Sequence, residues 1–257
     1  MAKRTNYRIL MQRTKYQGLV NVLKFNLPKY LLGLLFGLLG IYLLVSTENE
    51  MLRIIGLISQ TSWLLMALSL IVSHWIYDIS PLYSLDYLKD IPLDQNSQIV
   101  NISAGFDEIG DLLKDKYPKQ TIEHLDIFKS LEKRETSIKI ARKQNPKEEL
   151  NQVLDFKLPL ESNSKDLILL FFAAHEIREH ENRILFFEEL KRILKPGGRI
   201  LLTEHQRDFY NFVAYTFGFF HFFSQKTWLD LFKRTGFQLN RIRKENPWVK
   251  TFNIQKT

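Results

Sequence analysis

Two long apolar stretches stand near the start of the chain. Residues 30–45 include no charged side chain, and residues 54–76 carry none that is ionised, His74 being the one titratable group. An α-helix rises about 1.5 Å per residue, so ~20 apolar residues are enough to cross the roughly 30 Å hydrocarbon core of a bilayer. Only a short polar segment, residues 46–53, separates the two stretches. The pattern therefore predicts a two-helix transmembrane hairpin over residues 30–76.

Two other interpretations of these stretches stay open. The first stretch alone resembles the apolar region of a signal peptide, although the basic region before it is long and no small-residue cleavage pattern follows Leu44. A pair of helices that is apolar all round can also form the core of a soluble protein. Such a pair would need a partner surface before the separate domain that follows, so we favour the hairpin.

From about residue 98 the pattern changes to short apolar segments that alternate with amphipathic ones. Strands are predicted at residues 98–103, 121–126, 153–156, 166–172 and 199–204, with helices at 108–117, 136–143 and 181–194. The chain closes with a helix at 227–235 and strands at 237–244 and 249–255. The run at 166–172 is continuously apolar, as expected of a strand that is buried on both faces. This alternation predicts an α/β fold with a doubly wound, mostly parallel sheet.

Charge is distributed unevenly along the chain. The formal net charge is +8, but residues 1–29 hold seven Lys and Arg and no acid, so the other 29 basic residues nearly balance the 28 acids. The basic character therefore belongs to a terminal arm, which argues against a nucleic-acid-coating body. The chain contains no cysteine, which excludes disulfides, thiolate metal sites and a cysteine nucleophile.

The flanks of the hairpin predict its orientation and divide the chain. The basic arm precedes the hairpin, whereas the connecting turn carries Glu48, Glu50 and only Arg53, so the positive-inside rule puts both ends in the cytoplasm. A short hairpin of this kind suits a bacterial inner membrane. We expect a cytoplasmic arm at 1–29, the hairpin at 30–76, an interfacial linker at 77–97 and the α/β domain at 98–257. The aromatic rings expected near the inner headgroups are Trp75, Tyr77, Tyr83 and Tyr87.

The second half of the domain carries a family resemblance. The segments LPLESNSKDLILLFFAAHEI and FFEELKRILKPGGRILLTEH, residues 158–177 and 186–205, resemble the fourth strand, the following helix and the fifth strand of class I S-adenosylmethionine-dependent methyltransferases. The spacing from Leu158-Pro159 through Asp166 to Lys195-Pro196-Gly197-Gly198 is the most specific part. The resemblance covers residues 98–257 and implies a Rossmann-like, seven-stranded-type sheet, S-adenosylmethionine as the cofactor and methyl transfer as the reaction.

A cofactor site is expected at the carboxyl ends of the first strands. The loop after the first strand, residues 103–107, contains Gly105, which lets the backbone approach a ligand closely, and Asp126 follows 21 residues later, close to the usual spacing of ~20 for a ribose-binding acid. The resemblance adds Asp155 near the adenine. The loop departs from the family pattern G-x-G-x-G, because it reads S-x-G-x-D. The expected cofactor-binding residues are Ser103, Gly105, Asp107, Asp126, Asp155 and Ala173.

Ionisable residues follow both the fourth and the fifth strand. They are His175, Glu176 and Arg178 after the fourth, and Glu204, His205, Arg207 and Asp208 after the fifth. The carboxyl ends of parallel strands lie at the same edge of the sheet, so we expect these groups to line one ligand-binding crevice there. Histidine is the natural general base near neutral pH. We expect His175 first, and His205 second, to take the proton from the methyl acceptor.

The other members of these two segments have supporting roles in this hypothesis. Glu176 and Glu204 are expected to orient the imidazoles, whereas Arg178 and Arg207 are expected to hold an anionic group of the substrate or to neutralise the acids. A purely structural role in helix caps and ion pairs is the alternative for each. A metal site is a less favoured alternative, and its candidate ligands are Asp107, His175, Glu176, Glu204 and His205.

The segment 209–223 is strongly aromatic, with nine Phe or Tyr in FYNFVAYTFGFFHFF. Such a segment lines a greasy pocket, contacts the bilayer interface or packs as domain core. Asn211 is a candidate to join the site, and His221 is expected to be a hydrogen-bonded core residue. Together with the hairpin, this segment suggests a lipophilic substrate that enters from the membrane.

Three functional hypotheses follow. The leading one is a membrane-anchored methyltransferase that uses S-adenosylmethionine and acts on a lipid-like or quinone-like small molecule, with the lipid bilayer as a partner and no nucleic acid. The second is a methyltransferase-like fold with other chemistry, of which metal-assisted chemistry is one form. The third is a non-catalytic binding protein tethered to the membrane.

Overall fold

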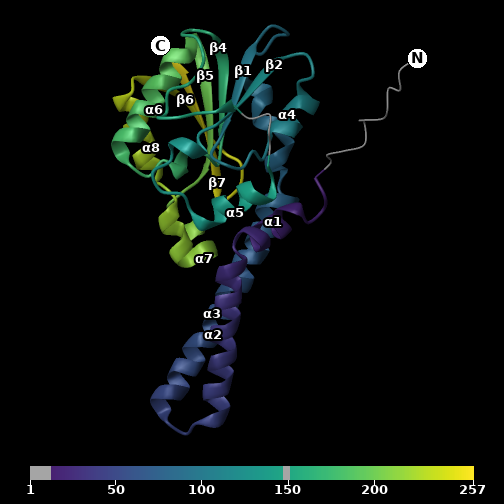
Figure 1. Cartoon of the computed structure of the whole chain (residues 1–257), viewed down its shortest axis with the longest axis vertical. Helices are drawn as coiled ribbons and strands as arrows, with labels where there is room; N and C mark the ends of the chain where they lie inside the picture. Colours follow the sequence, from purple (N-terminus) through teal and green to yellow (C-terminus); the bar gives the residue numbers. More distant parts are fainter. Residues whose placement is uncertain (1–12, 147–150) are drawn as a thin grey trace, which may run out of the picture.

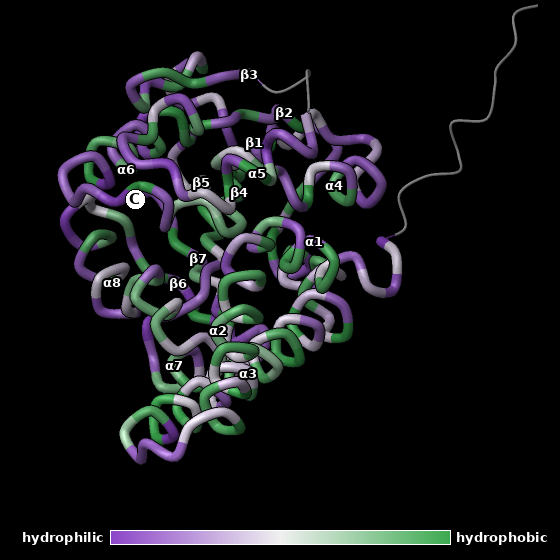
Figure 2. The backbone as a smooth tube through the Cα atoms, turned by 60° about the horizontal axis from the view of Figure 1, so that its bottom comes forward, coloured by the Kyte–Doolittle hydropathy of each residue, from purple (hydrophilic) through white to green (hydrophobic). Residues whose placement is uncertain are grey.

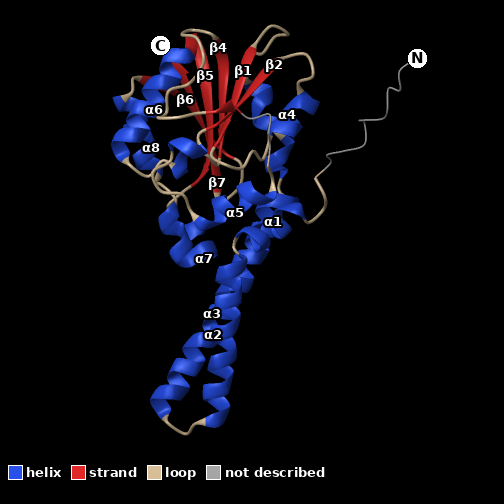
Figure 3. Ribbon diagram, viewed as in Figure 1, coloured by secondary structure: helices blue, strands red, loops and turns tan. Residues whose placement is uncertain are grey.

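The computed structural model describes residues 13–146 and 151–257 and contains an α/β body from which a helical hairpin projects (Figure 1). The body is built on one seven-stranded sheet (Figure 3). Its strands are β1 Gln98–Ser103, β2 Thr121–Asp126, β3 Asn151–Gln152, β4 Lys165–Phe171, β5 Leu194–His205, β6 Phe237–Lys244 and β7 Val249–Lys256. The strand order is β3-β2-β1-β4-β5-β7-β6, and only β7 runs antiparallel to its neighbours. The mostly parallel, doubly wound sheet is thus confirmed.

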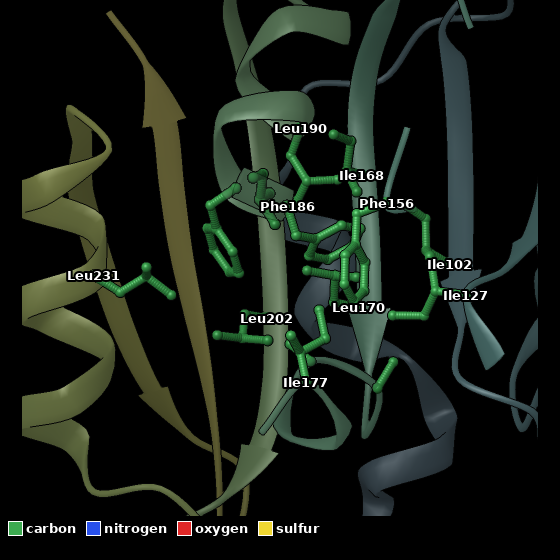
Figure 4. Close-up of a cluster of buried hydrophobic side chains, with 14 of the residues drawn as sticks. Ile102, Ile127, Phe156, Ile168, Leu170, Ile177, Phe186, Leu190, Leu202 and Leu231 are labelled. Carbon is green, nitrogen blue, oxygen red and sulfur yellow. The ribbon is translucent and has the colours of Figure 1, made fainter. Parts of the chain in front are cut away.

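The two faces of the sheet are covered by different apolar clusters. Along β4, Ile168 and Leu170 belong to one cluster, whereas Leu167 and Leu169 belong to the other. Successive residues of a strand point to opposite faces, so a strand buried on both sides reads as a continuous apolar run. Figure 4 shows the first cluster, in which Phe186 of α6 packs against Ile168 and Leu170.

The helices of the body lie close to their predicted positions, except that no helix was predicted over residues 209–215. They are α4 Gly110–Lys116, α5 Thr136–Gln144, α6 His180–Ile193, α7 Phe209–Tyr215 and α8 Gln225–Arg234. The predicted strand at 153–156 is wrong, because β3 comprises only Asn151–Gln152. Asp155 and Phe156 have φ of 53° and 56°, and this left-handed backbone cannot continue a strand. Phe156 instead buries its ring in the core.

The hairpin consists of α2 Leu27–Ser46 and α3 Glu50–His74, both long and apolar enough to cross a membrane by length and composition. Figure 2 shows the apolar character of both helices. They approach closely at Gly37, where a Cβ atom would meet the indole of Trp63 at 1.9 Å. Gln60 Nε2 donates to Gly37 O at 3.0 Å, which ties the helices by a hydrogen bond. Asn49 begins α3 by accepting a hydrogen bond from Leu52 N.

The base of the hairpin is joined firmly to the body. A π-helical turn, Trp75–Ile79, and two 3-10 segments, Pro81–Ser84 and Asp86–Asp90, form the region expected as an interfacial linker. Leu82, Leu85 and Leu88 of this region are almost fully buried against one face of the sheet. Apolar burial of this extent fixes the hairpin relative to the sheet.

The described part of the basic arm also packs on this base. Helix α1 Gln17–Phe25 begins beside the π-helical turn, where Gly18 N and Leu19 N donate to the carboxylate of Asp78 at 2.6 and 2.9 Å. His74 Nδ1 lies 2.8 Å from the same carboxylate. Figure 1 shows α1 beside α5, next to the carboxyl ends of the central strands.

Candidate active site

A polar cavity of about 210 Å³ lies at the carboxyl ends of the central strands. Residues after β1, β4 and β5 line it together with residues of α1, α5 and the 3-10 segment Thr216–His221. The strand order reverses between β1 and β4, and doubly wound sheets bind their ligands at such a switch point. The polar and ionisable side chains of the lining are Arg13, Asn21, Asn26, Tyr77, Tyr83, Glu108, Ser137, His175, Glu176, His205 and His221.

His175, Glu176 and Glu204 come together as the sequence predicted. His175 Nδ1 lies 2.6 Å from Glu204 Oε2, and Glu204 Oε1 accepts hydrogen bonds from the backbone N–H groups of Ala174 and His175 at 3.0 and 3.2 Å. On the other side of the ring, His175 Nε2 lies 3.4 Å from Glu176 Oε1. The imidazole is therefore held between two carboxylates, and Glu204 is fully buried.

The two carboxylates determine the charge of His175. Burial alone lowers the pKa of His175, but the charge of Glu204 and hydrogen bonds to both carboxylates outweigh it and raise this pKa to about 10. Burial raises the pKa of Glu176, yet hydrogen bonds from His175 and His221 hold that pKa well below its usual range. The raised pKa favours the imidazolium form of His175 at neutral pH, in which both ring nitrogens donate hydrogen bonds.

This protonation gives a pH-dependent stability. The folded-state pKa of His175 lies above its usual value of 6.5, so the stabilisation is complete below pH 6.5 and is lost as the pH rises to about 10. The expected slope is at most about 1.4 kcal/mol per pH unit. Thermal unfolding of the wild type and of a His175→Gln/Glu204→Gln double variant measures it. A stability difference that does not change over this range would contradict the imidazolium assignment.

His205 has the opposite character. Its Nδ1 lies 3.0 Å from Asn211 Oδ1, and its Nε2 lies 2.8 Å from the hydroxyl of Tyr77. Asn211 Nδ2 donates to Asp208 Oδ1 and Trp248 O, both at 3.0 Å, so its Oδ1 must accept from His205. Nδ1 therefore carries the proton, and Nε2 accepts from Tyr77. Burial lowers the pKa of His205 to about 3, so the ring is neutral.

Aromatic rings hold His205 in place. The imidazole is stacked between Phe172, at 4.9 Å and 17°, and Phe222, at 4.7 Å and 20°. Tyr77 reaches it from the π-helical turn after α3. Of the tyrosines predicted near the headgroups, Tyr87 is buried, Tyr83 donates to Glu108, and Tyr77 lines the cavity, so these side chains make contacts within the protein. Sequence pattern did not predict these contacts within the protein, because tyrosines that flank a hydrophobic hairpin usually mark the membrane interface.

His221 is a further cavity residue, whereas sequence reasoning expected it in the core. Its Nε2 lies 3.4 Å from Glu176 Oε1, and its Nδ1 lies 3.3 Å from Glu135 Oε1. The rings of His175 and His221 are 4.9 Å apart. His175, Glu176 and His221 each offer a ligand atom within 4.8 Å of the others. The broader metal set considered from the sequence is not assembled, since Asp107 bonds Asn101 and the N-terminus of α4 instead.

Both arginines proposed for the substrate bind backbone carbonyls. Arg178 Nη1 donates to His175 O at 3.1 Å and to His221 O at 2.6 Å. Arg207 donates to Phe222 O and Phe220 O at 2.7 and 2.6 Å. In this arrangement they hold the aromatic segment against the strand ends. Asn211, proposed alongside them, orients His205.

The expected cofactor residues lie at the neighbouring edge, after β1 and β2. Asp126 is fully buried, and its Oδ1 accepts from Phe128 N at 2.9 Å. Its Oδ2 accepts from Arg142 and from Gln152 Nε2. Gly105 has φ of 103°, and a Cβ atom there would meet the ring of Phe128 at 2.7 Å.

The remaining expected cofactor residues are placed as follows. Ser103 Oγ donates to Leu125 O at 3.3 Å, and Ala173 is buried beneath the cavity-lining loop after β4. Asp107 Oδ1 accepts from Asn101 Nδ2 at 2.8 Å and from Gly110 N at 2.9 Å, so its carboxylate is turned toward α4. Asp155 is exposed. The cavity lining therefore includes none of these six residues.

Comparisons with known proteins agree with this architecture. Residues 119–202 match the family described as Methyltransferase domain. No curated protein matches the chain. A solved S-adenosylmethionine-dependent methyltransferase from Aquifex aeolicus is 18% identical with a TM-score of 0.52, over 67% of this chain and 89% of that one. Methyltransferases from Methanosarcina mazei and Mesorhizobium loti are 17% and 15% identical, with TM-scores of 0.47 and 0.44, over 64% and 67% of this chain and 94% and 97% of theirs.

The chemistry of the strand-end residues fits S-adenosylmethionine. However, Arg142 forms an ion pair with Asp126, the acid that would bind the ribose hydroxyls. Asp126 is a buried carboxylate at the end of β2, and Gly105 provides the close backbone approach. The guanidinium of Arg142 neutralises that carboxylate, and Phe128 and Ile138 fill the space beside Gly105. Ribose hydroxyls that bind Asp126 would therefore have to displace the Arg142 side chain, which reduces the apparent affinity.

Arg142→Ala is expected to tighten cofactor binding at least about tenfold, because the carboxylate of Asp126 is left buried without the positive charge of Arg142 and becomes available to ribose hydroxyls. Calorimetric titration with S-adenosylmethionine measures this change. Lys143→Ala, which removes one exposed positive charge from the same helix, is the control. Weaker binding by Arg142→Ala would show that Arg142 belongs to the cofactor site.

The match to the methyltransferase family and the shared sheet architecture lead to one conclusion. Residues 119–202 match the methyltransferase domain family, the body shares its fold with a solved S-adenosylmethionine-dependent methyltransferase, and these two findings indicate S-adenosylmethionine as the cofactor.

Proposed function

We propose that this protein is a membrane-anchored S-adenosylmethionine-dependent methyltransferase that acts on a lipophilic, lipid-like or quinone-like small molecule. The observation that carries the proposal is the hydrogen bond between Tyr77, in the π-helical turn that follows α3, and His205, at the end of β5. It couples an apolar anchor to the switch point of the sheet. We propose that the hairpin spans the membrane twice and that the domain lies on the cytoplasmic side, as in a bacterial inner membrane.

Tyr77 and His205 supply proton removal in this proposal. S-adenosylmethionine, when bound, supplies an activated methyl group. As the acceptor hydroxyl or amine becomes methylated, its proton passes to the Tyr77 oxygen while the Tyr77 proton passes to His205 Nε2. Asn211 keeps that nitrogen free to accept by holding the proton on Nδ1. Such general-base assistance typically contributes about 10²–10⁴ in rate.

The His175 cluster has an orienting role in the same proposal. The imidazolium of His175 and the carboxylate of Glu176 face the cavity together with His221. A charged donor and a charged acceptor side by side can orient the polar end of an acceptor, and charge-assisted hydrogen bonds are the strongest available for this purpose. In this proposal the His175 cluster orients the acceptor, and His205 is the neutral base.

Radiolabelled methyl transfer tests the proposal. Full-length protein in lipid vesicles is incubated with methyl-labelled S-adenosylmethionine and a total bacterial lipid extract, and label is expected in the organic phase. Calorimetry measures cofactor binding on the same preparation. Absence of cofactor binding at millimolar concentration would overturn the proposal, and cofactor binding with label confined to the aqueous phase would overturn the lipophilic acceptor.

One observation favours a second candidate, metal-assisted chemistry on the same fold. His175, Glu176 and His221 form a two-histidine, one-carboxylate group, and such a group suits several divalent ions. A metal bound to His175 Nε2, the nitrogen that faces Glu176, would have to displace the proton on that nitrogen, whereas Glu204 would keep its hydrogen bond to Nδ1. Elemental analysis of purified protein decides between them: stoichiometric metal and loss of activity on chelation would favour the second candidate.

A further inference from the structure

A second cavity, of about 530 Å³, lies between the hairpin and the aromatic segment. It shares lining residues with the polar cavity, among them Tyr77, His221 and Phe222. Tyr77, which carries the hydroxyl proposed to accept the substrate proton, therefore borders both cavities.

The second cavity runs along one face of α3. Its lining there consists of Ser62, Leu65, Met66, Ser69, Ser73 and Tyr77. These positions are spaced by one, three or four residues, so they form a single stripe on the helix. From the first to the last the helix rises about 22 Å. This is the scale of one leaflet with its headgroup region.

The lining changes in character along this stripe. The end inside the hairpin is formed by Leu65 and Met66 of α3 and by Ser62, whose hydroxyl donates to Ser59 O within the helix. Phe217 of the 3-10 segment Thr216–His221, with 87% of its surface exposed, flanks the groove. The end at the site is formed by hydroxyl-bearing and ionisable side chains. Among them, the hydroxyl of Tyr215 interacts with the hydroxyls of Ser73 and Tyr77. These hydroxyls make the end of the cavity at the site polar.

The gradient matches an amphiphile in its ordinary membrane orientation. Figure 1 shows α3 leading from the hairpin tip toward the body, with α7 beside its upper end. With the hairpin across the bilayer, the apolar end of the groove lies among acyl chains and the polar end lies at the headgroups. A single-chain amphiphile bound in this groove would keep its tail among the acyl chains and its polar end at the headgroups, so it would not have to leave the membrane.

We infer that this second cavity binds the apolar chain of the methyl acceptor, and that the acceptor is a long-chain amphiphile whose polar end bears the nucleophile. The inference rests on the proposed function, since the head is assigned to the Tyr77 hydroxyl. It adds the substrate class, the route of entry and the residues that select chain length.

Photo-crosslinking tests the groove without relying on methyl transfer. Full-length protein in phosphatidylcholine vesicles is labelled with a long-chain alcohol that carries a diazirine in its chain, and the labelled residues are mapped by mass spectrometry. Labelling of Leu65, Met66 and Phe217 is expected to saturate with probe. Labelling of Ile58, which is 59% exposed on the outside of α3, is expected to rise in proportion to probe.

Two blocking variants and one control sharpen the result. Ser69→Trp and Leu65→Trp fill the groove, and Leu65 is partly exposed, so its replacement does not disturb the core. Ile71→Trp adds the same ring on the same helix at a side chain that is 66% exposed and outside the cavity. Both blocking variants are expected to lower saturable labelling and methyl incorporation at least about tenfold. For Ile71→Trp, saturable labelling and methyl incorporation should stay within about twofold of wild type. The affinity for the cofactor should stay within about twofold of wild type in all three variants.

The outcomes separate the two proposals. Labelling of the groove that never saturates, or that survives both blocking variants, would overturn the inference even if methyl transfer is intact. Saturable labelling without cofactor binding would overturn the proposed function and leave an amphiphile-binding groove.

Discussion

Tyr77→Phe is expected to lower methyl transfer by about 10²–10⁴ while the dissociation constant for S-adenosylmethionine stays unchanged. The variant keeps the ring, which contacts Phe172 at 6.0 Å, and removes only the hydroxyl that bonds His205. His205 then has no route to the acceptor proton. The measurement is the initial rate of label transfer to lipid extract at saturating cofactor, together with calorimetric affinity.

The control is Tyr42→Phe, which removes a phenol hydroxyl from the exposed side of the hairpin and should leave the rate unchanged. The pH profile adds a second readout. With a neutral imidazole whose pKa is lowered to about 3, the wild-type rate should not fall between pH 7 and pH 5 through protonation of His205. A Tyr77→Phe variant with wild-type activity would exclude the relay.

Glu204→Ala is expected to have the largest effect on stability, about 3–5 kcal/mol. The carboxylate is fully buried and serves three partners: the His175 ring and the backbone N–H groups of Ala174 and His175. Its removal leaves these donors buried with no acceptor. At roughly 2–4 °C per kcal/mol for a chain of this size, the Tm should fall by about 10 °C.

Glu204→Gln separates charge from hydrogen bonding. The amide oxygen can still accept from the two backbone N–H groups, so the loss should be smaller than for Glu204→Ala. Glu179→Ala, at the position before α6, removes an acid from a less buried site and serves as control. A Tm for Glu204→Ala within about 2 °C of wild type would contradict the assigned role of this carboxylate.

Local pattern was enough to predict most of the sheet. The strands at 98–103, 121–126 and 237–244 have the predicted limits, because short apolar runs between turn residues carry a strong local signal. β3 was misplaced because its two residues pair with Leu125 and Asp126 through backbone hydrogen bonds, which leave little trace in side-chain pattern. The helical hairpin extends over 27–46 and 50–74, close to the two apolar stretches.

Site chemistry was only partly predictable. His175, Glu176 and Glu204 were expected together, because residues that follow neighbouring parallel strands share one edge. The charge of His175 was not, since a pKa depends on how deeply the ring is buried and which carboxylates touch it. The pairing of Arg142 with Asp126 was missed because α5 meets β2 only in the folded chain.

The amino-acid sequence by itself determined the α/β class, the length of the apolar hairpin and the strand ends at which polar residues collect, since each of these follows from the spacing of neighbouring residues. Only the tertiary structure decided that Tyr77 meets His205, 128 positions later in the chain. It also decided that a groove joins the hairpin to the site. Contacts between distant segments have no periodic signature, because they depend on how whole elements pack against each other.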